Sequence, residues 1–306
     1  MTMALTPIQQ RAVYYSPLSF LRGHEQSLAT SFLKNLEHAV ENGVVECIGQ
    51  DIKIWVRHLE WDSQYFSCPT YRLEFADWDS DAIEAAANVA EKLIELKAEL
   101  LRRHGHYYLF TEIPSEDVVV LQALGLSGFR LIETRLTHYI DELESFEEQS
   151  AFPVRVARKE DAENLRDVAM CARNDFDRFH ADPFFSDLVA DDYLAEYTEK
   201  CILGLTDTVL VPGVDQLLPN AFICGALNID APNEMHIGRL VLVAVAEPRR
   251  GWYRHLNSAL LIWMKNNGMS YCVNTTQSTN RAVIHVCEQL GYKYGRSTHL
   301  LATYQK

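Results

Sequence analysis

Residues 236–292 restrict the possible folds of this chain more than any other stretch. Apolar, β-branched runs alternate there with segments whose leucines recur at helical spacing. We therefore predict a strand, a helix, a strand and a helix, over 236–245, 256–265, 270–274 and 281–290. Gly268 and Gly291 follow the two helices, as glycine commonly does at a helix end. This alternation predicts a mixed α/β fold.

The turn between the first strand and the first helix is a candidate phosphate site. It carries Arg249, Arg250 and Gly251. The first amides of a helix have no intrahelical partner and the helix dipole is positive at that end, so anions bind there. Strand–turn–helix units are common, and the turn by itself therefore does not identify a cofactor.

The order of these parts carries more information than the turn. Together with Thr-Gln-x-x-Asn-x-Ala at 276–282 and Leu-Gly-Tyr at 290–292, it resembles the acyl-CoA half of the GNAT acetyltransferase family. The resemblance implies that the strand before the turn separates from its neighbour and pairs its backbone with pantetheine, while the turn holds the pyrophosphate. The cofactor-binding residues that it implies are Leu242, Val243, Val245, Arg250, Gly251, Trp252, Tyr253, Arg254 and Asn280. Acetyl-CoA, or another short acyl-CoA, would be the acyl donor.

Two departures from the family pattern stand out. The family's turn usually reads Arg-Gly-x-Gly-x-Gly, whereas residues 250–255 read Arg-Gly-Trp-Tyr-Arg-His. Glycine lets backbone approach a phosphate closely, so Tyr253 and His255 must point away from the turn if CoA is to bind tightly. Many relatives also carry a general-acid Tyr four residues before the Gly of Leu-Gly-Tyr, where this chain has Cys287.

Cys287 and Tyr292 are the candidate catalytic residues. A thiol with an ordinary pKa near 8.5 can give a proton to the departing thiolate, but buried inert thiols are the commoner case. The ring of Tyr292 can equally serve packing, and Asn280 can serve as the N-cap of the last helix. These alternatives stay open at the sequence level.

The first half of the chain repeats this plan in outline. Helix, strand, helix and strand are expected over 81–105, 107–113, 115–124 and 129–139. The Leu-x-Trp-Asp-Ser opening at 59–63 resembles two-domain GNAT enzymes similar to dTDP-fucosamine acetyltransferase, whose first domain is a degenerate GNAT half. The acidic run 141–150 is typical of a solvated linker. We predict two tandem GNAT-like domains: a degenerate one at 1–150 with a helical lead-in and no CoA site, and an acetyltransferase domain at 151–306.

Residues 175–185 form the candidate acceptor loop. Charged residues alternate with phenylalanines there, and Pro183 breaks regular structure. Such loops favour ligand sites, although salt bridges that anchor a loop give the same composition. The helix after the loop begins with acidic residues at 191–192, and a similar loop and helix face the nucleotide-sugar acceptor in the fucosamine-type group. The candidate substrate residues are Arg178, His180, Asp182 and Tyr193.

Composition excludes several classes of function. A net charge of −14 argues against nucleic acid as a partner. No apolar run reaches the roughly 20 residues that span a bilayer, and the first ten residues lack the pattern of a signal peptide. The histidines and seven scattered cysteines show no metal-ligand spacing, so we expect no metal and reduced thiols in a cytoplasmic protein. A homodimer is compatible with the sequence.

The function expected from these features is acetyl-CoA-dependent N-acyl transfer, as in a GNAT-type N-acyltransferase. The expected acceptor is the amine of a nucleotide-linked amino-dideoxy sugar used in surface polysaccharide biosynthesis. The alternatives are acetylation of another small-molecule or protein amine, and a degenerate GNAT protein that binds a ligand without catalysis.

Overall fold

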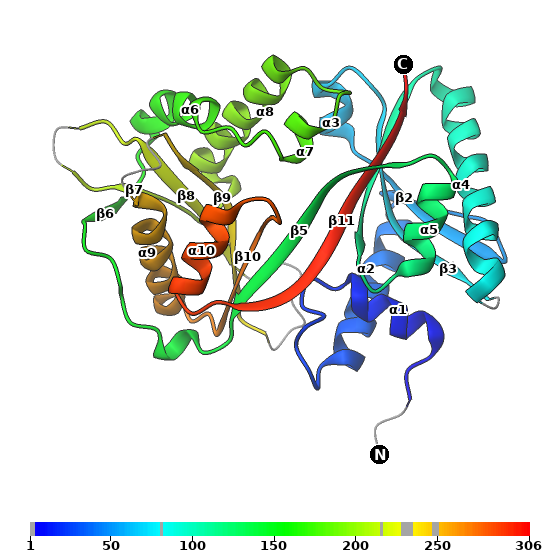
Figure 1. The fold of residues 1–306 in the computed structure, drawn as a ribbon, viewed down its shortest axis with the longest axis horizontal. Helices are drawn as coiled ribbons and strands as arrows, with labels where there is room; N and C mark the ends of the chain where they lie inside the picture. Colours follow the sequence, from blue (N-terminus) through cyan, green and yellow to red (C-terminus); the bar gives the residue numbers. More distant parts are fainter. Residues whose placement is uncertain (1–3, 80–81, 215–216, 228–234, 247–250) are drawn as a thin grey trace. The chain divides into compact units, whose positions relative to one another are not determined.

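The computed structural model describes residues 4–79, 82–214, 217–227, 235–246 and 251–306. Residue contacts divide the chain into two compact units (Figure 1). Unit 1 contains Met1–Arg135 and Arg296–Lys306, and unit 2 contains Leu136–Gly295. The compact units divide inside two long strands, β5 (Arg130–Ile140) and β11 (Lys293–Gln305), each of which begins in one unit and ends in the other. The predicted domains 1–150 and 151–306 stay a prediction.

Unit 1 is an α/β unit whose elements follow the predicted order. Its helices are α1 (Pro7–Tyr15), α2 (Glu25–Glu41), α3 (Glu60–Tyr65), α4 (Ala82–His104) and α5 (Val118–Leu126). The strands are β1 (Val45–Ile48), β2 (Ile52–His58), β3 (Thr70–Trp78) and β4 (Tyr107–Pro114), with the first part of β5. They lie in the order β1-β2-β3-β4-β11, and residues 298–305 of β11 pair antiparallel with β4. The Trp-Asp-Ser part of the opening at 59–63 lies in the short helix α3.

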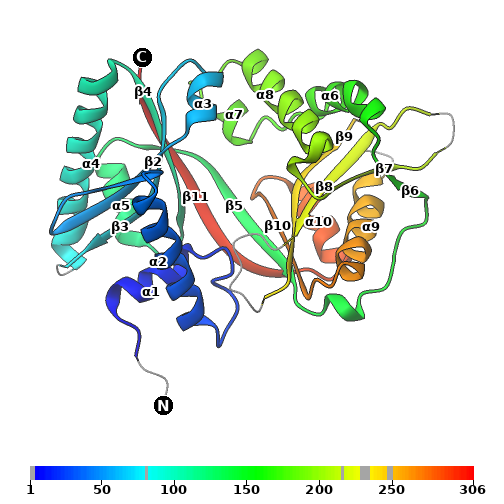
Figure 2. The same ribbon diagram turned by 180° about the vertical axis from the view of Figure 1, so that it is seen from behind.

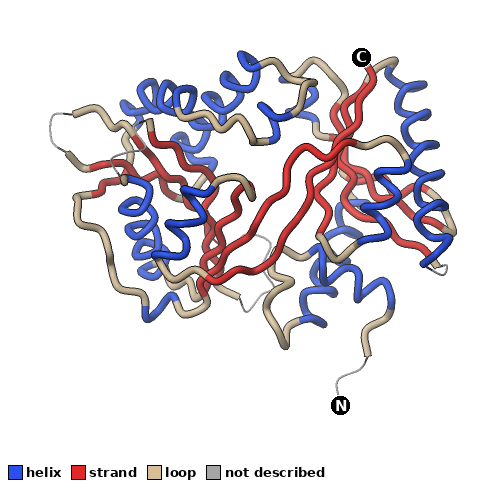
Figure 3. The backbone as a smooth tube through the Cα atoms, viewed as in Figure 1, coloured by secondary structure: helices blue, strands red, loops and turns tan. Residues whose placement is uncertain are grey.

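Two apolar clusters hold unit 1 together. One lies between the strands and helices α4 and α5, and includes Leu73, Leu93 and Leu109, none more than 1% exposed. The other joins α1 and α2 to Phe75 of β3. Burying a side chain of this size stabilises the fold by about 1.5–3 kcal/mol. Figure 3 shows the helices and strands of the unit by type.

Unit 2 contains the stretch from which the fold was predicted. Its helical segments are η1 (Leu143–Ser145), η2 (Lys159–Asp161), α6 (Ala162–Cys171), α7 (Arg178–Ala181), α8 (Asp187–Lys200), the π-helical turn η3 (Cys201–Leu205), α9 (Trp252–Asn266) and α10 (Arg281–Gln289). Its strands are β6 (Val154–Val156), β7 (Thr208–Pro212), β8 (Ala221–Leu227), β9 (Ile237–Val245) and β10 (Tyr271–Gln277). The order is β5-β10-β9-β8-β7-β6.

The sheet of unit 2 is covered on both faces, as the two views in Figures 1 and 2 agree. α9 and α10 pack on one face around Leu256, Leu260 and Leu261, which are fully buried. α6 and its neighbours pack on the other face around Leu165 and Phe222. The predicted helical face of α9 is therefore its core face, and the helix ends at Asn267 and Gly268 as expected.

Both units contain a place where two neighbouring parallel strands stop pairing. In unit 2, β9 and β10 pair from Ile237 with Tyr271 to Leu240 with Asn274, and both strands then continue without pairing to each other. A bulge at Val241 follows the last paired residue. We call the parts beyond this point, 241–245 of β9 and 275–277 of β10, the unit-2 fork. Bulges bend a strand and occur often next to active sites.

Candidate active site

The unit-2 fork contains the three strand residues predicted to bind the cofactor. Leu242, Val243 and Val245 remain paired with β8 on one side, and all three are half-buried. Since the pairing with β10 ends at Leu240, the β10-facing edge of this segment can hydrogen-bond to something other than a neighbouring strand. A fork of this kind is suited to an extended, amide-containing chain.

The turn after β9 ends in a left-handed residue. Gly251 has φ +70° and is the N-cap of α9, without a capping side chain. A Cβ built at Gly251 would meet no atom of the described residues within 4 Å, and the positive φ by itself favours glycine there. The amides in the first turn of α9 therefore have no capping side chain, and a helix start of this kind favours the binding of an anion. Arg250 lies outside the described residues.

The bulky residues of the turn point into the protein. Trp252 and Tyr253 are 7% and 9% exposed, and Trp252 packs against Phe152, with ring centroids 5.5 Å apart. His255 also packs edge-on against Phe152, and its Nδ1 lies 3.2 Å from the amide of Ala151. Arg254 donates to Gln149 over 3.1 Å. The two side chains whose size counted against tight CoA binding are therefore engaged with the rest of unit 2.

Tyr253 belongs to a buried polar network between α9, β10 and α10. Its hydroxyl accepts hydrogen bonds from Asn274 over 2.8 Å and from Asn257 over 3.1 Å. The same amide nitrogen of Asn274 lies 3.2 Å from the thiol sulfur of Cys287. Tyr292 donates to the side-chain oxygen of Asn257 over 2.8 Å. The two predicted catalytic residues are thus connected through Asn274, Tyr253 and Asn257. The two asparagines were not predicted from the sequence.

Burial keeps the members of this network neutral. Desolvation raises the pKa of Cys287 to about 11, although hydrogen bonds from Tyr253 and Asn274 oppose the shift. Desolvation also raises the pKa of both Tyr253 and Tyr292 well above the ordinary value. Neutral groups of this kind retain a proton that could be donated. However, Cys287 has no exposed surface, so its thiol is not accessible to a ligand in this structure.

Asn280 occupies the start of α10. Its side-chain oxygen accepts from the amide of Val283 over 3.3 Å, which makes it the N-cap of that helix. Asn280 therefore caps α10, which is one of the two roles considered for it. A role near a cofactor stays a prediction, because a capping side chain uses only part of its hydrogen-bonding capacity.

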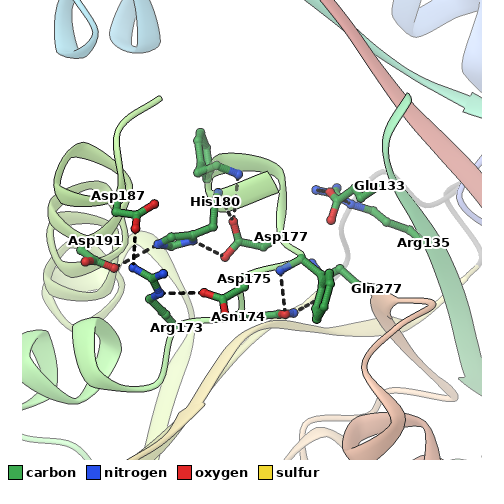
Figure 4. Close-up of polar contacts among 12 residues, drawn as sticks. Glu133, Arg135, Arg173, Asn174, Asp175, Asp177, His180, Asp187, Asp191 and Gln277 are labelled. Atoms are coloured by element: carbon green, nitrogen blue, oxygen red, sulfur yellow. Dashed lines mark hydrogen bonds and ion pairs between the residues drawn. The ribbon is translucent and has the colours of Figure 1, made fainter. Parts of the chain in front are cut away.

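The residue directly before the candidate acceptor loop, Asn174, contacts the end of β10. Asn174 donates to Gln277 over 3.0 Å (Figure 4). Gln277 is the last residue of β10, and its carbonyl also accepts from the amide of Asn280. The loop therefore lies beside the unit-2 fork and the start of α10. This contact brings the predicted acceptor and cofactor segments of unit 2 together.

His180 anchors the loop between two carboxylates. Its Nδ1 lies 2.9 Å from Asp177 and its Nε2 lies 3.0 Å from Asp191, and the side chain is 1% exposed (Figure 4). Arg173 likewise pairs with two carboxylates, Asp175 over 2.8 Å and Asp187 over 3.0 Å. Burial disfavours charge on His180, but the hydrogen bonds to the two carboxylates outweigh it and raise the pKa.

The other predicted substrate residues take part in loop packing. Arg178 lies over the ring of Phe179, 4.8 Å from its centroid, and Tyr193 packs on the same ring at 4.3 Å. Asp182 is 1% exposed and accepts from the amide of Phe184 over 3.0 Å. Asp182 is therefore a turn anchor in this structure. The aromatic cluster fixes the loop, and the Arg178 guanidinium is packed within it.

Solved structures similar to this chain agree on the type of fold. A GCN5-related N-acetyltransferase from Sphaerobacter thermophilus aligns over 97% of this chain and 94% of its own, with 10% identity and a TM-score of 0.55. One from Kribbella flavida aligns over 89% and 94%, with 13% identity and a TM-score of 0.52. A tandem GNAT protein from the clavulanic acid biosynthesis pathway aligns over 83% and 78%, with 10% identity and a TM-score of 0.53.

The chain has the GNAT fold. Neither a protein-family description nor a curated protein sequence matches it, so the fold rests on the structure. The prediction of a mixed α/β GNAT fold is confirmed, and a tandem GNAT protein is among the similar structures. At identities of 10–13% the likeness defines the fold, and activity must be argued from the residues of the site.

Metal ligands and membrane spans are two further features that would bear on the function of this GNAT fold. Within the described residues, no group of three or more His, Cys, Asp or Glu residues has the geometry of a metal site. Among the same residues, no helix is both long and apolar enough to cross a membrane.

Sequence reasoning missed Asn257 and Asn274, and a signal for one of them was present. Tyr253 and Asn257 are four residues apart on α9 and therefore share a helical face. That face also carries Leu256, Leu260 and Leu261. A polar pair inside an apolar helical stripe requires buried partners. Asn274 gave no such signal, because it lies where a short predicted strand meets a polar run.

His180 gives this site a pH dependence. A folded pKa above the unfolded value means that the stability contributed by His180 is complete below about pH 6.5 and is lost as pH rises through the folded pKa. We expect His180→Gln to lower stability by about 2 kcal/mol at pH 6, the scale of buried hydrogen bonds to charged groups. The difference from wild type should shrink at pH 9. Thermal melts at both pH values measure it.

His285→Gln is the matched control, since His285 is exposed on α10 and its ion pair with Glu288 spans 3.8 Å. It should melt like the wild-type protein at both pH values. A His180→Gln deficit of equal size at pH 6 and pH 9 would contradict a protonated His180.

Proposed function

We propose that this protein is an acyl-CoA-dependent N-acyltransferase whose cofactor site is the unit-2 fork and the turn at Gly251. The observation that supports this most is the end of β9–β10 pairing at Leu240, directly before a bulge and on the strand that leads toward Gly251. The segment 241–245 offers backbone groups to the amides of pantetheine. The uncapped start of α9 offers amides to a pyrophosphate.

The residues present fit acetyl-CoA, or another short acyl-CoA, as the donor. A Cβ-free left-handed residue stands at the helix start, and the large side chains beside it are turned into the unit. Amides of β9 around Leu242–Val245 would polarise the thioester carbonyl, because donors fixed beforehand cost no reorganisation as charge develops. Holding the acceptor amine in line with that carbonyl would supply the rest of the rate enhancement.

The acceptor that we propose is the amine of a nucleotide-linked amino-dideoxy sugar. The support is the position of the acceptor loop, whose preceding residue Asn174 contacts the end of β10, and the sequence resemblance of the loop and of residues 59–63 to fucosamine-type enzymes. Carboxylates of the loop pair with His180 and Arg173, so the loop that contains Arg178 keeps a defined shape. A defined loop reduces the entropy lost on binding.

The test is release of free thiol from acetyl-CoA in the presence of different amines. Nucleotide-linked 4-amino-4,6-dideoxyhexoses should give turnover well above that of free amino sugars, polyamines or peptide amines. Turnover with a peptide amine alone would move the acceptor to proteins. Calorimetric binding of acetyl-CoA without turnover on any amine would support a non-catalytic ligand-binding protein.

The buried position of Cys287 predicts a modest role in turnover. Cys287→Ala should keep kcat within about tenfold of wild type, because no part of the thiol is exposed and its sulfur is engaged by Asn274. General acid catalysis typically contributes about 10²–10⁴-fold. A loss of a hundredfold or more, with activity retained in Cys287→Tyr, would instead identify the thiol as the acid. Cys171→Ala, at an exposed cysteine of the same unit, is the control.

A further inference from the structure

Unit 1 contains a second fork with the same construction. β3 and β4 pair from Thr70 with Tyr108 to Leu73 with Thr111, and both strands then continue apart. A bulge at Glu74 follows the last paired residue, as Val241 does in unit 2. We call 74–78 of β3 and 112–114 of β4 the unit-1 fork. The element order β3-α4-β4-α5-β5 also repeats β9-α9-β10-α10-β11.

The end of α1 contacts the unit-1 fork on the β3 side. Arg11 donates to the main-chain oxygen of Trp78 over 3.2 Å, and its guanidinium lies 4.2 Å from the centroid of the Trp78 ring. Arg11 also forms an ion pair with Asp77. The ring of Tyr15 meets Phe75 edge-on, with centroids 4.9 Å apart. A main-chain acceptor of the separated strand is therefore used by a side chain of the lead-in.

The same segment reaches the far side of the fork. The hydroxyl of Tyr15 donates to Asp117 over 2.7 Å, and Asp117 is the N-cap of α5. Asp117 thus has the position in unit 1 that Asn280, the N-cap of α10, has in unit 2. Arg296 of β11 donates to the carbonyls of Tyr14 and Ser16, over 2.8 and 2.7 Å. Residues 11–16, which we call the plug, are therefore held from β3, α5 and β11.

The plug is packed as a core element. Ala12 is fully buried and Val13 is 6% exposed, and both belong to the apolar cluster that includes Phe75. Tyr15 packs against both clusters of unit 1. Burial of this extent means that the plug cannot leave without exposing apolar surface and separating the buried Tyr15–Asp117 pair.

The charges around the unit-1 fork also disfavour a phosphate. Asp77 and Asp79 lie at the end of β3, before α4, whereas the helix that corresponds to α4 in unit 2, α9, begins after the uncapped Gly251; Asp117 lies at the start of α5, where unit 2 has Asn280. Carboxylates near a helix start occupy the position that an anion would take. Among the described contacts of this region, Arg11 of the plug is the group that balances them.

We infer that the plug replaces an acyl-CoA in the unit-1 fork, so that the chain's own N-terminal segment fills the place that a cofactor fills in unit 2. The comparison rests on the proposed function of unit 2, while the contacts of the plug do not. The inference assigns a role to the lead-in: it completes the fold of a unit whose ligand groove has lost its ligand. One acyl-CoA then binds per chain.

The first experiment combines calorimetry with hydrogen exchange in the presence of acetyl-CoA. We expect one acetyl-CoA per chain, with added protection at 241–246 and 251–256 and none at 74–78 or 118–121. Two acetyl-CoA molecules per chain, or protection at 74–78, would overturn the inference. If acetyl-CoA does not bind at all, the proposed function fails. The second experiment then tests by itself whether the plug holds the unit-1 fork.

The second experiment compares two variants that each remove one hydroxyl. Tyr15→Phe keeps the ring on Phe75 and removes the hydrogen bond to Asp117, so amides at 118–121 should exchange at least about tenfold faster than in wild type. Tyr14→Phe changes the neighbouring residue, which is 37% exposed, and should leave those amides within about twofold. Equal exchange at 118–121 in all three proteins would show that the plug does not hold the fork.

Discussion

Acetyl-CoA affinity should fall by about a hundredfold in Gly251→Asp, close to 2.7 kcal/mol. Gly251 begins α9 in a left-handed conformation, and Asp and Asn adopt this conformation more readily than other non-glycine residues. A Cβ at this position meets no atom of the described part of the chain within 4 Å, so we expect neither side chain to clash with that part. The carboxylate would lie where we propose that a pyrophosphate binds, and at about 5 Å the repulsion of like charges is worth a few kcal/mol.

Gly251→Asn is the matched control, because it has the shape of aspartate without the charge. Its affinity should stay within about fivefold of wild type in calorimetry at low salt. Thermal melts would verify that both variants are folded. Equal affinity of the Asp and Asn variants would mean that the phosphates bind elsewhere and that the turn at Gly251 is not the cradle.

The elements that sequence predicts well are those set by local pattern. The strand 236–245, the helical face of Leu256, Leu260 and Leu261 and the helix ends at Gly268 and Gly291 all agree with the structure within a few residues. Each depends on spacing or on the backbone freedom of glycine, which operate over a few neighbours. The GNAT resemblance drew on the same stretch, and the similar structures agree with it.

Features that depend on distant pairing were not predictable in this way. No local pattern reveals that β5 and β11 each belong to two units, because strand pairing is decided by tertiary contacts. The same holds for Asn274, whose buried partners lie on two helices. The lead-in was recognised as helical, but its role depends on Tyr15 meeting Asp117, which is 102 residues away along the chain.

The loop at 175–185 shows how composition can leave two interpretations open. Its alternation of charges and phenylalanines favoured a ligand site, and ion pairs that anchor a loop were the alternative. The structure contains those ion pairs, at His180 and Arg173. It also places the loop beside Gln277. Anchoring does not exclude binding, since a loop that binds a ligand must itself be held in place, and the role of Arg178 stays a prediction.

Glu112→Gln should cost unit 1 about 3 kcal/mol at pH 7, the free energy that corresponds to the lowered pKa of this carboxyl. Glu112 of β4 lies 3.1 Å from Arg135 and accepts from Thr298 over 2.7 Å. Burial opposes its charge, but Arg135, Arg72 and nearby groups outweigh this and lower the pKa of Glu112 to about 2. Glutamine keeps the shape and the acceptor oxygen, yet it removes one of the two carboxylates that pair with Arg135, the other being Glu133.

The pH dependence of this effect has a definite sign. A depressed pKa means that the contribution of Glu112 is complete above the unfolded value of about 4.3 and is lost as pH falls toward 2, about 3 kcal/mol in all. The deficit of Glu112→Gln relative to wild type in urea unfolding should therefore be constant from pH 7 to 5 and narrow below pH 4.3. A deficit that stays constant down to pH 2.5 would contradict a charged, paired Glu112.

Glu99→Gln separates the influence of burial from that of pairing. The pKa of Glu99 is also lowered to about 2, through hydrogen bonds from Arg102 and Arg103. These three residues lie on the surface of α4, where water screens both partners. Glu99→Gln should therefore unfold at nearly the wild-type urea concentration, although its carboxylate is paired as closely as that of Glu112. If the two variants lost equal stability, pairing alone would account for the loss, and the burial of Glu112 beside Arg135 would not be its cause.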